Sequence, residues 1–457
     1  GMPAAIFAAD RGARVLILEA EAEIGGSLWV STGQMSAAGS RVQKDKGIED
    51  TPDEHYDDIM RISRGTANPG IVRLAVDNAA DTFDWLCDLG LVVEPHHPIT
   101  GWGHEHYSKR RYYWAPEGGL SIKAVLTPQV DKRVAEGRIA VRVQHKVVEL
   151  LTQDGGVTGV VAQDADGGRH AFSARKVALT SGGYGANPQM FEALSGVPQY
   201  SAAAYRGSQG VGHRLGEAVG GVLRGAEHYF IGFGSVLEGH VYPAPTVARL
   251  ITAPERRQPW EIYVNVLGER FVREDIPSVD ARENALFVQP DKRYWVIFDQ
   301  AILDAAPPMV DDWSRDEVAA AFDGSRTSFI KADTLTALAA AAGIDADGLA
   351  RSVEGYNYGV QTGHDFFGRA HRPLPISRTP FYAIRQQGAT VTSAVGLAVN
   401  DGLQVVRADG SAIPNLFAAG EILGSSQTMG RSACGGMMVT PAMTFGRLLG
   451  QTIIPLE

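Results

Sequence analysis

The chain has 457 residues, 44% of them hydrophobic and 21% charged, which is the composition of an ordinary globular protein of about three domain-sized units. Its formal net charge is −10 and its longest basic cluster is the short run at residues 109–111, which excludes a large nucleic-acid interface. Two cysteines exclude a disulfide framework, and without a membrane-length apolar run or a signal peptide we expect a cytoplasmic protein with no membrane span.

Glycine is overrepresented, with 53 residues where average usage is roughly 7% of a chain. The chain has only 23 prolines and no low-complexity run, so the excess does not indicate disorder. It indicates places where the backbone lies close to another group, because glycine has no side chain in the way.

The first elements resemble half of a dinucleotide-binding unit. Residues 2–10 are small and apolar and predict a helix, and residues 14–19 predict a buried parallel strand that ends at Glu19. In a dinucleotide fold such a helix follows a first strand and a G-x-G-x-x-G turn, and an acidic residue ends the second strand. Gly1 either holds the place of the third glycine or is a cloning remnant before an early methionine. In both cases the first strand does not occur in this sequence.

Residues 139–179 predict a meander of short strands, with Asp-Gly-Gly turns at 154–156 and 166–168. The meander leads into TSGGYG at residues 180–185.

The composition changes between about residues 232 and 375. Strands are predicted at 262–266 and 294–298, and helices at 316–322 and 334–342. We interpret these residues as an inserted second domain.

Four separated segments have the residue types that a large, planar, phosphate-bearing ligand needs. Glu19 suits ribose hydroxyls, and residues 25–27 (GGS) expose backbone N–H groups to a pyrophosphate. The glycine pair within 179–185 and the carboxylate of Glu421 after an apolar strand complete the set. Each has an ordinary alternative, since a strand-terminal glutamate is usually only solvated and a glycine pair usually only turns the chain.

The most specific segment lies near the C-terminus. Thr440 and Pro441 open a predicted helix at 442–449, with Thr440 as the N-cap and Pro441 at the first helical position. The N-terminus of a helix favours an anionic ring edge by about 0.3–2 kcal/mol. The alternative is an ordinary capped and buried helix.

The whole chain resembles the FAD-binding flavoprotein family of fumarate reductase, succinate dehydrogenase and 3-ketosteroid dehydrogenases. The last of the matching stretches is more similar to ketosteroid dehydrogenases (M-G-R-S-Y-x-G…G-P-A-M-x-F-G) than to fumarate reductases. The stretches run nearly end to end in family order and are RVLILEAEAEIGGS, KVALTSGGYGAN, GERFVRED, ADTLTALAAAAGIDADGLARSVEGYN, DFFGR, PFYAI, NLFAAGE and MGRSACGGMMVTPAMTFGRLLG.

This resemblance implies an α/β protein with a Rossmann-like FAD-binding domain over residues 1–231 and 376–457, and an inserted α+β capping domain at 232–375. Succinate dehydrogenases carry FAD on a histidine shortly after the glycine pair. Residues 27–35 contain none, so non-covalent FAD is expected here. No metal is expected. The cofactor-binding residues implied in this way are Gly1, Glu19, Ala20, Gly25, Gly26, Ser27, Thr32, Gly33, Val147, Ser181, Gly182, Gly183, Gly420, Glu421, Thr440, Pro441 and Ala442.

Members of the family move a hydride between the flavin and a carbon β to a carbonyl, while a proton is lost or gained at the α carbon. Their acid–base residue follows the glutamate of R-F-x-x-E by four positions and is arginine in fumarate reductases and tyrosine in ketosteroid dehydrogenases. Here that position is Ser278. Arg282, one helical turn later, is the substitute on the same face. Its ordinary alternative is a surface or salt-bridging residue.

Other diagnostic residues of the two branches are also missing. The ketosteroid tyrosine after M-G-R-S is Ala433, and residues 385–396 lack the histidine with which fumarate reductases bind a carboxylate. Arg431 is the candidate replacement for their arginine near the C-terminal glycines. A small dicarboxylate is therefore disfavoured.

Residues 96–114 are rich in histidine and aromatic side chains, whose phenols are candidate acid–base groups or donors to a ketone. Histidine side chains ordinarily titrate near neutrality, which makes His104 and His106 further candidates, but with Glu105 they form only a weak metal pattern. The ordinary alternative is a packed aromatic loop. The candidate catalytic residues are Arg282, Ser278, Tyr112, Tyr113 and Tyr107.

We therefore predict an FAD enzyme that dehydrogenates, or in reverse reduces, a carbon–carbon bond next to a carbonyl. Its substrate is a small molecule, expected to be a cyclic or steroid-like ketone, and its external electron acceptor or donor is not specified by the sequence. One alternative is a reductase of an unsaturated carboxylate with Arg282 as the acid. An alternative of another class is a non-catalytic flavin-binding subunit, motivated by Ser278 and Ala433.

Overall fold

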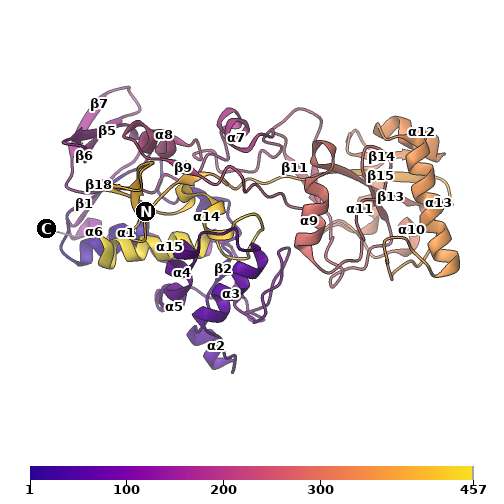
Figure 1. Ribbon diagram of the computed structural model, residues 1–457, viewed down its shortest axis with the longest axis horizontal. Coiled ribbons are helices and arrows are strands. Elements are labelled where there is room, and N and C mark those ends of the chain that lie inside the picture. Colours follow the sequence, from indigo (N-terminus) through magenta and orange to yellow (C-terminus); the bar gives the residue numbers. More distant parts are fainter. Residues whose placement is uncertain (455–457) are drawn as a thin grey trace. The chain divides into compact units, whose positions relative to one another are not determined.

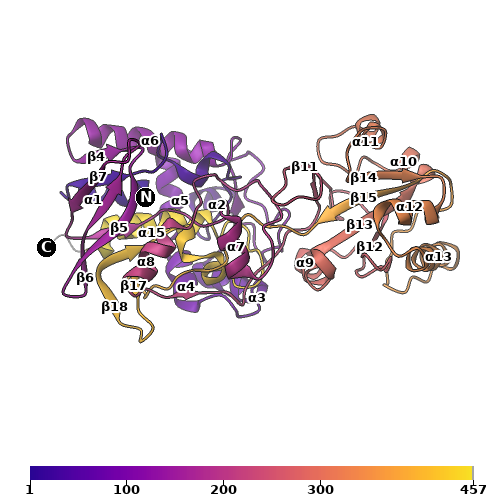
Figure 2. The same cartoon turned by 90° about the horizontal axis from the view of Figure 1, so that it is seen from above.

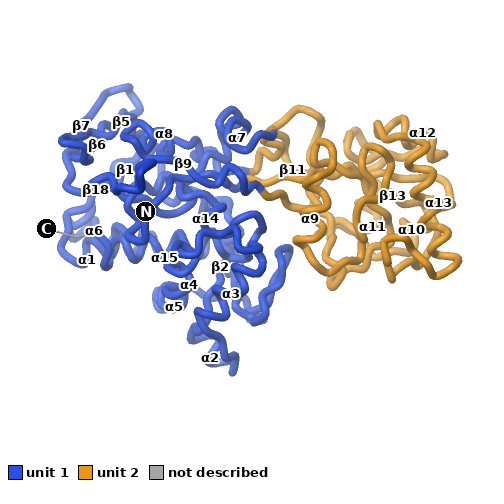
Figure 3. The backbone as a smooth tube through the Cα atoms, viewed as in Figure 1, with its two compact units in different colours: residues 1–197, 204–229, 392–457 blue, residues 198–203, 230–391 orange. Residues whose placement is uncertain are grey.

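Residues 1–454 are described by a computed structural model, which divides the chain into two units (Figure 3). Unit 1 comprises residues 1–197, 204–229 and those from 392 onward, and unit 2 comprises residues 198–203 and 230–391. The sequence predicts an insertion at 232–375. Unit 2 extends further because the strand at 381–387 pairs with two other strands of the same unit.

Unit 1 is built from helices and short strands taken from both ends of the chain (Figure 1). Its helices are α1 (Met2–Asp10), α2 (Arg41–Asp45), α3 (Pro52–Ile62), α4 (Pro69–Asp77), α5 (Ala79–Asp88), α6 (Gly119–Ala135), α7 (Pro188–Ser195), α8 (Val211–Ala218), α14 (Ser425–Met429) and α15 (Val439–Leu448), with the turns η1 (Gly26–Trp29), η3 (Glu421–Leu423) and η4 (Leu449–Ile453). Its strands are β1 (Val15–Leu18), β2 (Met35–Ser36), β3 (Tyr112–Tyr113), β4 (Ile139–Arg142), β5 (Lys146–Gln153), β6 (Gly156–Gln163), β7 (Arg169–Ser173), β8 (Val177–Leu179), β9 (Leu223–Arg224), β16 (Gly396–Leu397), β17 (Gln404–Val406) and β18 (Ala412–Ala418).

The predicted helix at 2–10 and strand at 14–19 are confirmed by α1 and β1. β1 pairs in parallel with β4, and β8 pairs in parallel with β18. The interpretation of residues 139–143 as part of the meander is wrong, because β4 pairs with β1 while β5, β6 and β7 form their own antiparallel sheet. β1 is also less buried than predicted, with Leu16 38% exposed.

The predicted Asp-Gly-Gly turn at 154–156 joins β5 to β6. Asp154 and Gly155 have φ angles of 51° and 76°. Two consecutive left-handed residues are what a two-residue hairpin turn with the right twist requires, which explains the Asp-Gly sequence.

Helices α6 and α15 each pack against α1 in unit 1 (Figure 1). The approach of η4 to α1 depends on a missing side chain: a Cβ at Gly450 would lie 2.3 Å from the carbonyl oxygen of Ala4. The core around these helices includes Ile6, Phe83, Ile122, Leu126 and Val130, which are at most 2% exposed.

Unit 2 contains a four-stranded antiparallel sheet in the order β12–β13–β15–β14, and α12 and α13 pack against it (Figure 2). Its helices are α9 (Val279–Phe287), α10 (Gln300–Ala305), α11 (Arg315–Ala321), α12 (Leu335–Ala342) and α13 (Ala346–Thr362), with the turn η2 (Pro290–Lys292). Its strands are β10 (Ser235–Leu237), β11 (Thr246–Arg249), β12 (Ile262–Val264), β13 (Arg293–Asp299), β14 (Phe329–Ala332) and β15 (Phe381–Gln387).

The strands predicted at 262–266 and 294–298 are confirmed by β12 and β13, and the two predicted helices by α11 and α12. Thr334 caps α12, accepting a 3.1 Å hydrogen bond from the backbone N–H of Ala337. Across residues 1–454, every helix is too short or too polar to cross a membrane.

Close backbone packing at Gly33 yields a stability prediction. Gly33 and Gly47 share a φ of 65°, but a Cβ at Gly33 would lie 2.3 Å from the carbonyl carbon of Gly118, whereas Gly47 faces open space. Gly47→Ala is expected to cost about 1–2 kcal/mol for the left-handed backbone alone. Gly33→Ala is expected to cost about 1–3 kcal/mol more through overpacking. Denaturant unfolding of both variants measures the difference, and equal losses would contradict it.

Candidate functional site

The candidate cofactor residues of unit 1 lie where its parallel strands end. Glu19 follows β1, Ser181 and the adjacent glycines follow β8, and Glu421 follows β18. In open α/β sheets, ligands bind outside the carboxyl ends of the strands.

Gly183 and Glu421 are in direct contact. A Cβ at Gly183 would lie 2.6 Å from Oε1 of Glu421 and 2.0 Å from Oγ of Ser393. The same Oε1 accepts hydrogen bonds from the backbone N–H and hydroxyl of Ser393, at 3.1 and 3.0 Å. Burial raises the pKa of Glu421, and hydrogen bonds from Ser393 and the Gly183 N–H oppose the shift. Sequence reasoning missed Ser393, which lies far from both partners along the chain.

Glu19 is held at the end of β1 by its own chain neighbours. Its Oε1 accepts a 2.9 Å hydrogen bond from the N–H of Glu21, and the N–H of Ala20 contributes as well. Burial is the largest influence and raises the pKa of Glu19. The carbonyl of Glu19 accepts a 2.8 Å hydrogen bond from the N–H of His145. Val147 follows two residues later, near the start of β5.

The start of α1 lies at the end of β8, because a Cβ at Gly1 would be 3.0 Å from Oγ1 of Thr180. Next to Thr180, Ser181 packs against α8, where a Cβ at Gly212 would be 2.2 Å from its hydroxyl. The structure therefore brings Gly1 and the turn at 181–183 together.

The turn at residues 25–27 opens η1. A Cβ at Gly25 would lie 2.9 Å from Cε of Lys123, whose Nζ is 4.1 Å from the ring centroid of Trp29. A cation beside such a turn suits a phosphate. Lys123 comes from α6, which is distant in the sequence, so no local pattern at residues 25–27 predicted it.

Thr32 and Gly33 pack against the start of α6. The Cβ that Gly118 lacks would lie 3.0 Å from the carbonyl atoms of Thr32. Their role in the structure is to seat the turn on α6, and a direct contact with the cofactor stays a prediction.

Three glycines with left-handed backbone lie at these turns and face open space, as the binding of a large ligand requires. A Cβ at Gly26 (φ 54°) would have no atom within 4 Å, and one at Gly182 (φ 75°) would have only Oγ of Ser208, at 3.9 Å. A Cβ at Gly420 (φ 92°) would have only Cβ of Ala442, at 3.9 Å. These turns thus leave open space where a side chain would stand, and the residues present fit the pyrophosphate and ring of FAD.

The predicted N-cap role of Thr440 is wrong. Helix α15 already begins at Val439 with Met438 as its N-cap residue, so Pro441 occupies the third helical position. The hydroxyl of Thr440 instead bridges the backbone of Ser36, accepting from its N–H at 2.8 Å and donating to its carbonyl at 3.1 Å. Pro441 is tolerated because N–H groups in a first helical turn have no intrahelical partner.

The three candidate tyrosines are buried, as the packed-loop alternative anticipates. Tyr107 donates to the carbonyl of Gly435 at 2.5 Å, and the hydroxyl of Tyr113 pairs with that of Ser40 at 2.7 Å. Tyr112 differs: its hydroxyl has no hydrogen-bond partner among residues 1–454, and its ring lies 3.0 Å from a Cβ position at Gly435. Burial raises the pKa of Tyr112 well above its ordinary value.

The histidines of this segment are structural neighbours of the tyrosines. Burial lowers the pKa of His104 to about 4, so it is neutral at pH 7. Nδ1 of His106 pairs with the Thr100 hydroxyl at 2.9 Å. Within the described chain, no group of three or more His, Cys, Asp or Glu side chains is arranged to hold a metal ion.

In unit 2, Ser278 is the N-cap of α9, where its side chain accepts a 3.1 Å hydrogen bond from the N–H of Ala281. Arg282 is 1% exposed and donates to the carbonyl of Ile276. No ion pair joins it to a carboxylate in the part of the chain that the structure describes. The surface or salt-bridging alternative for Arg282 is therefore wrong.

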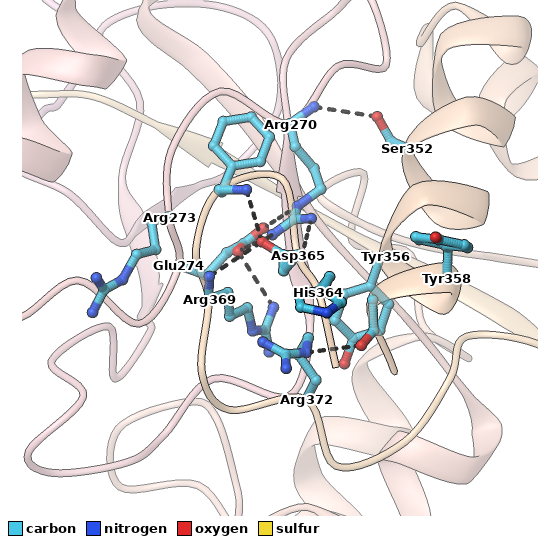
Figure 4. Close-up of polar contacts among 12 residues, drawn as sticks. Arg270, Arg273, Glu274, Ser352, Tyr356, Tyr358, His364, Asp365, Arg369 and Arg372 are labelled. Carbon is cyan, nitrogen blue, oxygen red and sulfur yellow. Dashed lines mark hydrogen bonds and ion pairs between the residues drawn. The ribbon is translucent and has the colours of Figure 1, made fainter. Parts of the chain in front are cut away.

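The GERFVRED and DFFGR stretches form a buried ion network (Figure 4). Arg270 donates two hydrogen bonds of 2.7 and 2.8 Å to Glu274 and two of 2.7 and 3.3 Å to Asp365. Arg369 lies 3.4 Å from the same Glu274. Two cations and two carboxylates balance, as buried charges must, so this network is structural.

The two remaining candidates lie in the C-terminal glycine segment of unit 1. The backbone N–H of Arg431 donates to Oγ1 of Thr66 at 3.0 Å, and Ala433 is 6% exposed.

The contact between Gly183 and Glu421 yields a binding prediction. Gly183→Ala is expected to displace Ser393 or Glu421 and raise the dissociation constant of FAD at least tenfold, or about 1.4 kcal/mol. Gly355→Ala in α13 is the control, because a Cβ there meets nothing within 4 Å. Flavin fluorescence on dilution measures both variants, and equal affinities would refute the prediction.

The comparisons with known proteins agree with this geometry. The FAD binding domain family matches residues 1–437. A probable fumarate reductase, Ifc3 of Shewanella frigidimarina, is 28% identical over 98% of this chain and 72% of its own. The urocanate reductase of Eggerthella lenta is 29% identical over 98% and 72%. The 3-ketosteroid Δ1-dehydrogenase structure from Sterolibacterium denitrificans, at 20% identity over 99% of this chain and 97% of that one, shares the fold with a TM-score of 0.75. The chain therefore belongs to the FAD binding domain family and is an FAD-dependent oxidoreductase.

Proposed function

We propose that this enzyme dehydrogenates, or in reverse reduces, a carbon–carbon bond next to the carbonyl of a cyclic ketone, with FAD held non-covalently in unit 1. FAD, when bound, accepts or gives the hydride at the carbon β to the carbonyl. The residues of the chain must then hold the cofactor, polarise the carbonyl and move the proton at the α carbon.

The observation that supports a ketone is the buried hydroxyl of Tyr112, which has no hydrogen-bond partner in the described part of the chain. A buried O–H without an acceptor costs about 1–3 kcal/mol, so its retention calls for a partner from outside the chain. Its raised pKa keeps it protonated, and a protonated phenol can donate to a ketone oxygen as enolate character develops. Tyr107 and Tyr113 already use their hydroxyls within unit 1, and we assign them structural roles.

The cofactor is held, in this proposal, by backbone N–H groups and two carboxylates. The turns at Gly26 and Gly182 present N–H groups to the pyrophosphate. Glu19 and Glu421 accept hydrogen bonds from ribose and ribityl hydroxyls, while Thr440 fixes the start of α15 on Ser36 beside the flavin ring.

A second candidate is the reduction of an unsaturated carboxylate with Arg282 as the proton donor. Two observations favour it: Arg282 is buried without a carboxylate partner in residues 1–454, and two relatives are named as a fumarate reductase and a urocanate reductase. The two candidates separate in one experiment. Reoxidation of the reduced flavoprotein by unsaturated acids, and not by unsaturated cyclic ketones, would replace the first candidate with the second.

Removal of the Tyr112 hydroxyl tests the carbonyl donor. Tyr112→Phe is expected to lower kcat for cyclic ketones by about 10²- to 10³-fold, as the loss of one donor to a developing oxyanion does. Because the pKa of Tyr112 lies above the assay range, the loss is expected to be the same from about pH 6 to pH 9. Tyr113→Phe, which breaks a 2.7 Å hydrogen bond, is the matched control for a purely structural effect. A kcat of Tyr112→Phe within twofold of Tyr113→Phe would rule out the donor role.

Non-covalent FAD is tested by release. Residues 27–35 offer no histidine for a covalent link, so denaturation followed by ultrafiltration is expected to leave all flavin in the filtrate. Flavin that stays with the denatured chain, detected by mass spectrometry of the intact protein, would show a covalent link.

A further inference from the structure

The sheet of unit 2 carries two arginines close together on one of its faces. Trp295 and Arg385 are register partners on β13 and β15. Arg293 and Gln387 are also register partners, and they point to the same side because they lie two residues away along each strand. Arg293 and Arg385 are therefore diagonal neighbours, close enough for their long side chains to contact one ligand.

Arg385 is buried and has only neutral partners. Its side chain belongs to a residue that is 4% exposed. The guanidinium donates to Oγ of Ser328 at 3.1 Å, to the carbonyl of Gly239 and to the imidazole of His240. No ion pair joins Arg385 to a carboxylate in the part of the chain that the structure describes. Burial without a counter-ion lowers the pKa of Arg385.

Arg293 has no carboxylate partner among residues 1–454 either. Its Nε lies 3.4 Å from Oε1 of Gln387, and its Nη2 lies 3.3 Å from the hydroxyl of Tyr242. Both partners are neutral, and both distances are long for hydrogen bonds. The positive charge of Arg293 also lowers the pKa of Arg385, while Tyr242 and Glu238 raise it.

The nearby carboxylates do not balance the two arginines. Glu238 pairs with Arg326 at 3.3 Å. Asp291 is exposed, so water screens its charge. Arg257 in the same unit shows what a compensated arginine looks like: it pairs with the buried Glu261 at 2.8 Å, and this carboxylate raises the pKa of Arg257 in spite of its burial.

Trp295, directly opposite Arg385, lacks a hydrogen-bond acceptor. It is 2% exposed, and its indole nitrogen has no partner among the described residues. Buried polar groups in native proteins are almost always hydrogen-bonded. The indole N–H is a donor only, so the missing partner is an acceptor. This face thus lacks both a negative charge and an acceptor, and a single anion supplies both.

We propose that Arg385, Arg293 and Trp295 bind a phosphate group, either as inorganic phosphate or as a phosphate monoester. Such a group carries nearly two negative charges at neutral pH, which two guanidiniums balance. Its oxygens also match the planar fork of a guanidinium. A carboxylate or a chloride ion would neutralise only one of the two arginines.

The site opens to solvent at the connection between β10 and β11. His240 and Val241 lie in this connection and are exposed. Bound phosphate takes the place of the His240 imidazole beside Arg385, because an exposed, neutral side chain moves away at little cost. Every residue of the site belongs to unit 2, and the site does not depend on the proposed reaction.

Calorimetric titration of the FAD-saturated protein tests the site directly, because bound FAD occupies the phosphate-binding turns proposed in unit 1. At pH 8, inorganic phosphate is expected to bind once per chain and at least tenfold more tightly than acetate. Phenyl phosphate distinguishes the two sources of the group. Tighter binding of phenyl phosphate than of inorganic phosphate identifies a monoester as the ligand, and equal or weaker binding identifies free phosphate. Equal affinity for phosphate and acetate would overturn the site.

Two variants test the assigned residues. Arg385→Gln and Arg293→Gln are each expected to weaken phosphate binding at least tenfold, because each leaves a negative charge of the ligand unbalanced. Arg293 is only half-buried, so it provides a folded variant even if Arg385→Gln does not fold. Arg249→Gln, which removes an exposed arginine of β11, is the matched control and is expected to bind phosphate like the unchanged protein. Phosphate affinity of Arg293→Gln within twofold of this control would refute the assignment.

Melting temperatures in phosphate-free buffer test the missing negative charge without a ligand. Arg257→Gln leaves the buried carboxylate of Glu261 unpaired and is expected to lower the melting temperature strongly. Arg385→Gln strands no carboxylate and is expected to lower it less. Phosphate added at constant ionic strength is expected to raise the melting temperature of the unchanged protein and not that of Arg385→Gln. An equal loss in the two variants would show that the charge of Arg385 is balanced inside the protein, and the site would not exist.

Discussion

The cofactor half of this molecule depends on one missing side chain. Because Gly183 has no Cβ, the carboxylate of Glu421 and the hydroxyl of Ser393 occupy the space at the end of β8, where a Cβ would approach them to 2.6 and 2.0 Å. This contact ties together the ends of β8 and β18, two strands that lie about half of the chain length apart in the sequence. Backbone that approaches its neighbours in this way leaves no room for substitution, and it explains why the glycine content of the chain is high without disorder.

Buried charge is handled differently in two parts of unit 2. Around Glu274 the ion network closes on itself, with two arginines and two carboxylates in hydrogen-bonding contact (Figure 4). A closed network of this kind fixes the packing of α13 and the loop after it and leaves no charge for a ligand. Arg282 has only a backbone carbonyl as a partner among the described residues. The contrast within one unit is the reason for assigning a structural role to the first group and for keeping Arg282 as a candidate proton donor.

Local patterns predicted much of the fold. The helix at 2–10, the strand after it and the turn at 154–155 follow from composition and turn chemistry within a few residues. Non-local pairing was not predictable in this way: β4 pairs with β1 because of tertiary packing, and nothing in residues 139–143 distinguishes that from membership of the meander. Thr440 shows the same limit. Its hydroxyl does not cap α15 but bonds to the backbone of Ser36, a residue distant in the sequence.

The candidate site was predictable where several motifs occur together in the order typical of the family, as with the glycine turns and Glu421. It was missed where partners come from distant elements, as with Ser393 and with Lys123 of α6. A buried polar atom without a hydrogen-bond partner among the described residues, as at Tyr112 and Arg282, is a property of the folded chain and has no counterpart in a sequence pattern.

The central claim is that the strand ends and glycine turns of unit 1 hold one flavin. A visible-absorption titration of the flavin-free protein with FAD tests it most directly. The account predicts a saturable change in the flavin band that reaches its end point at a single FAD per chain. A protein that stays colourless after gel filtration, with all added FAD in the low-molecular-weight fraction, would contradict it.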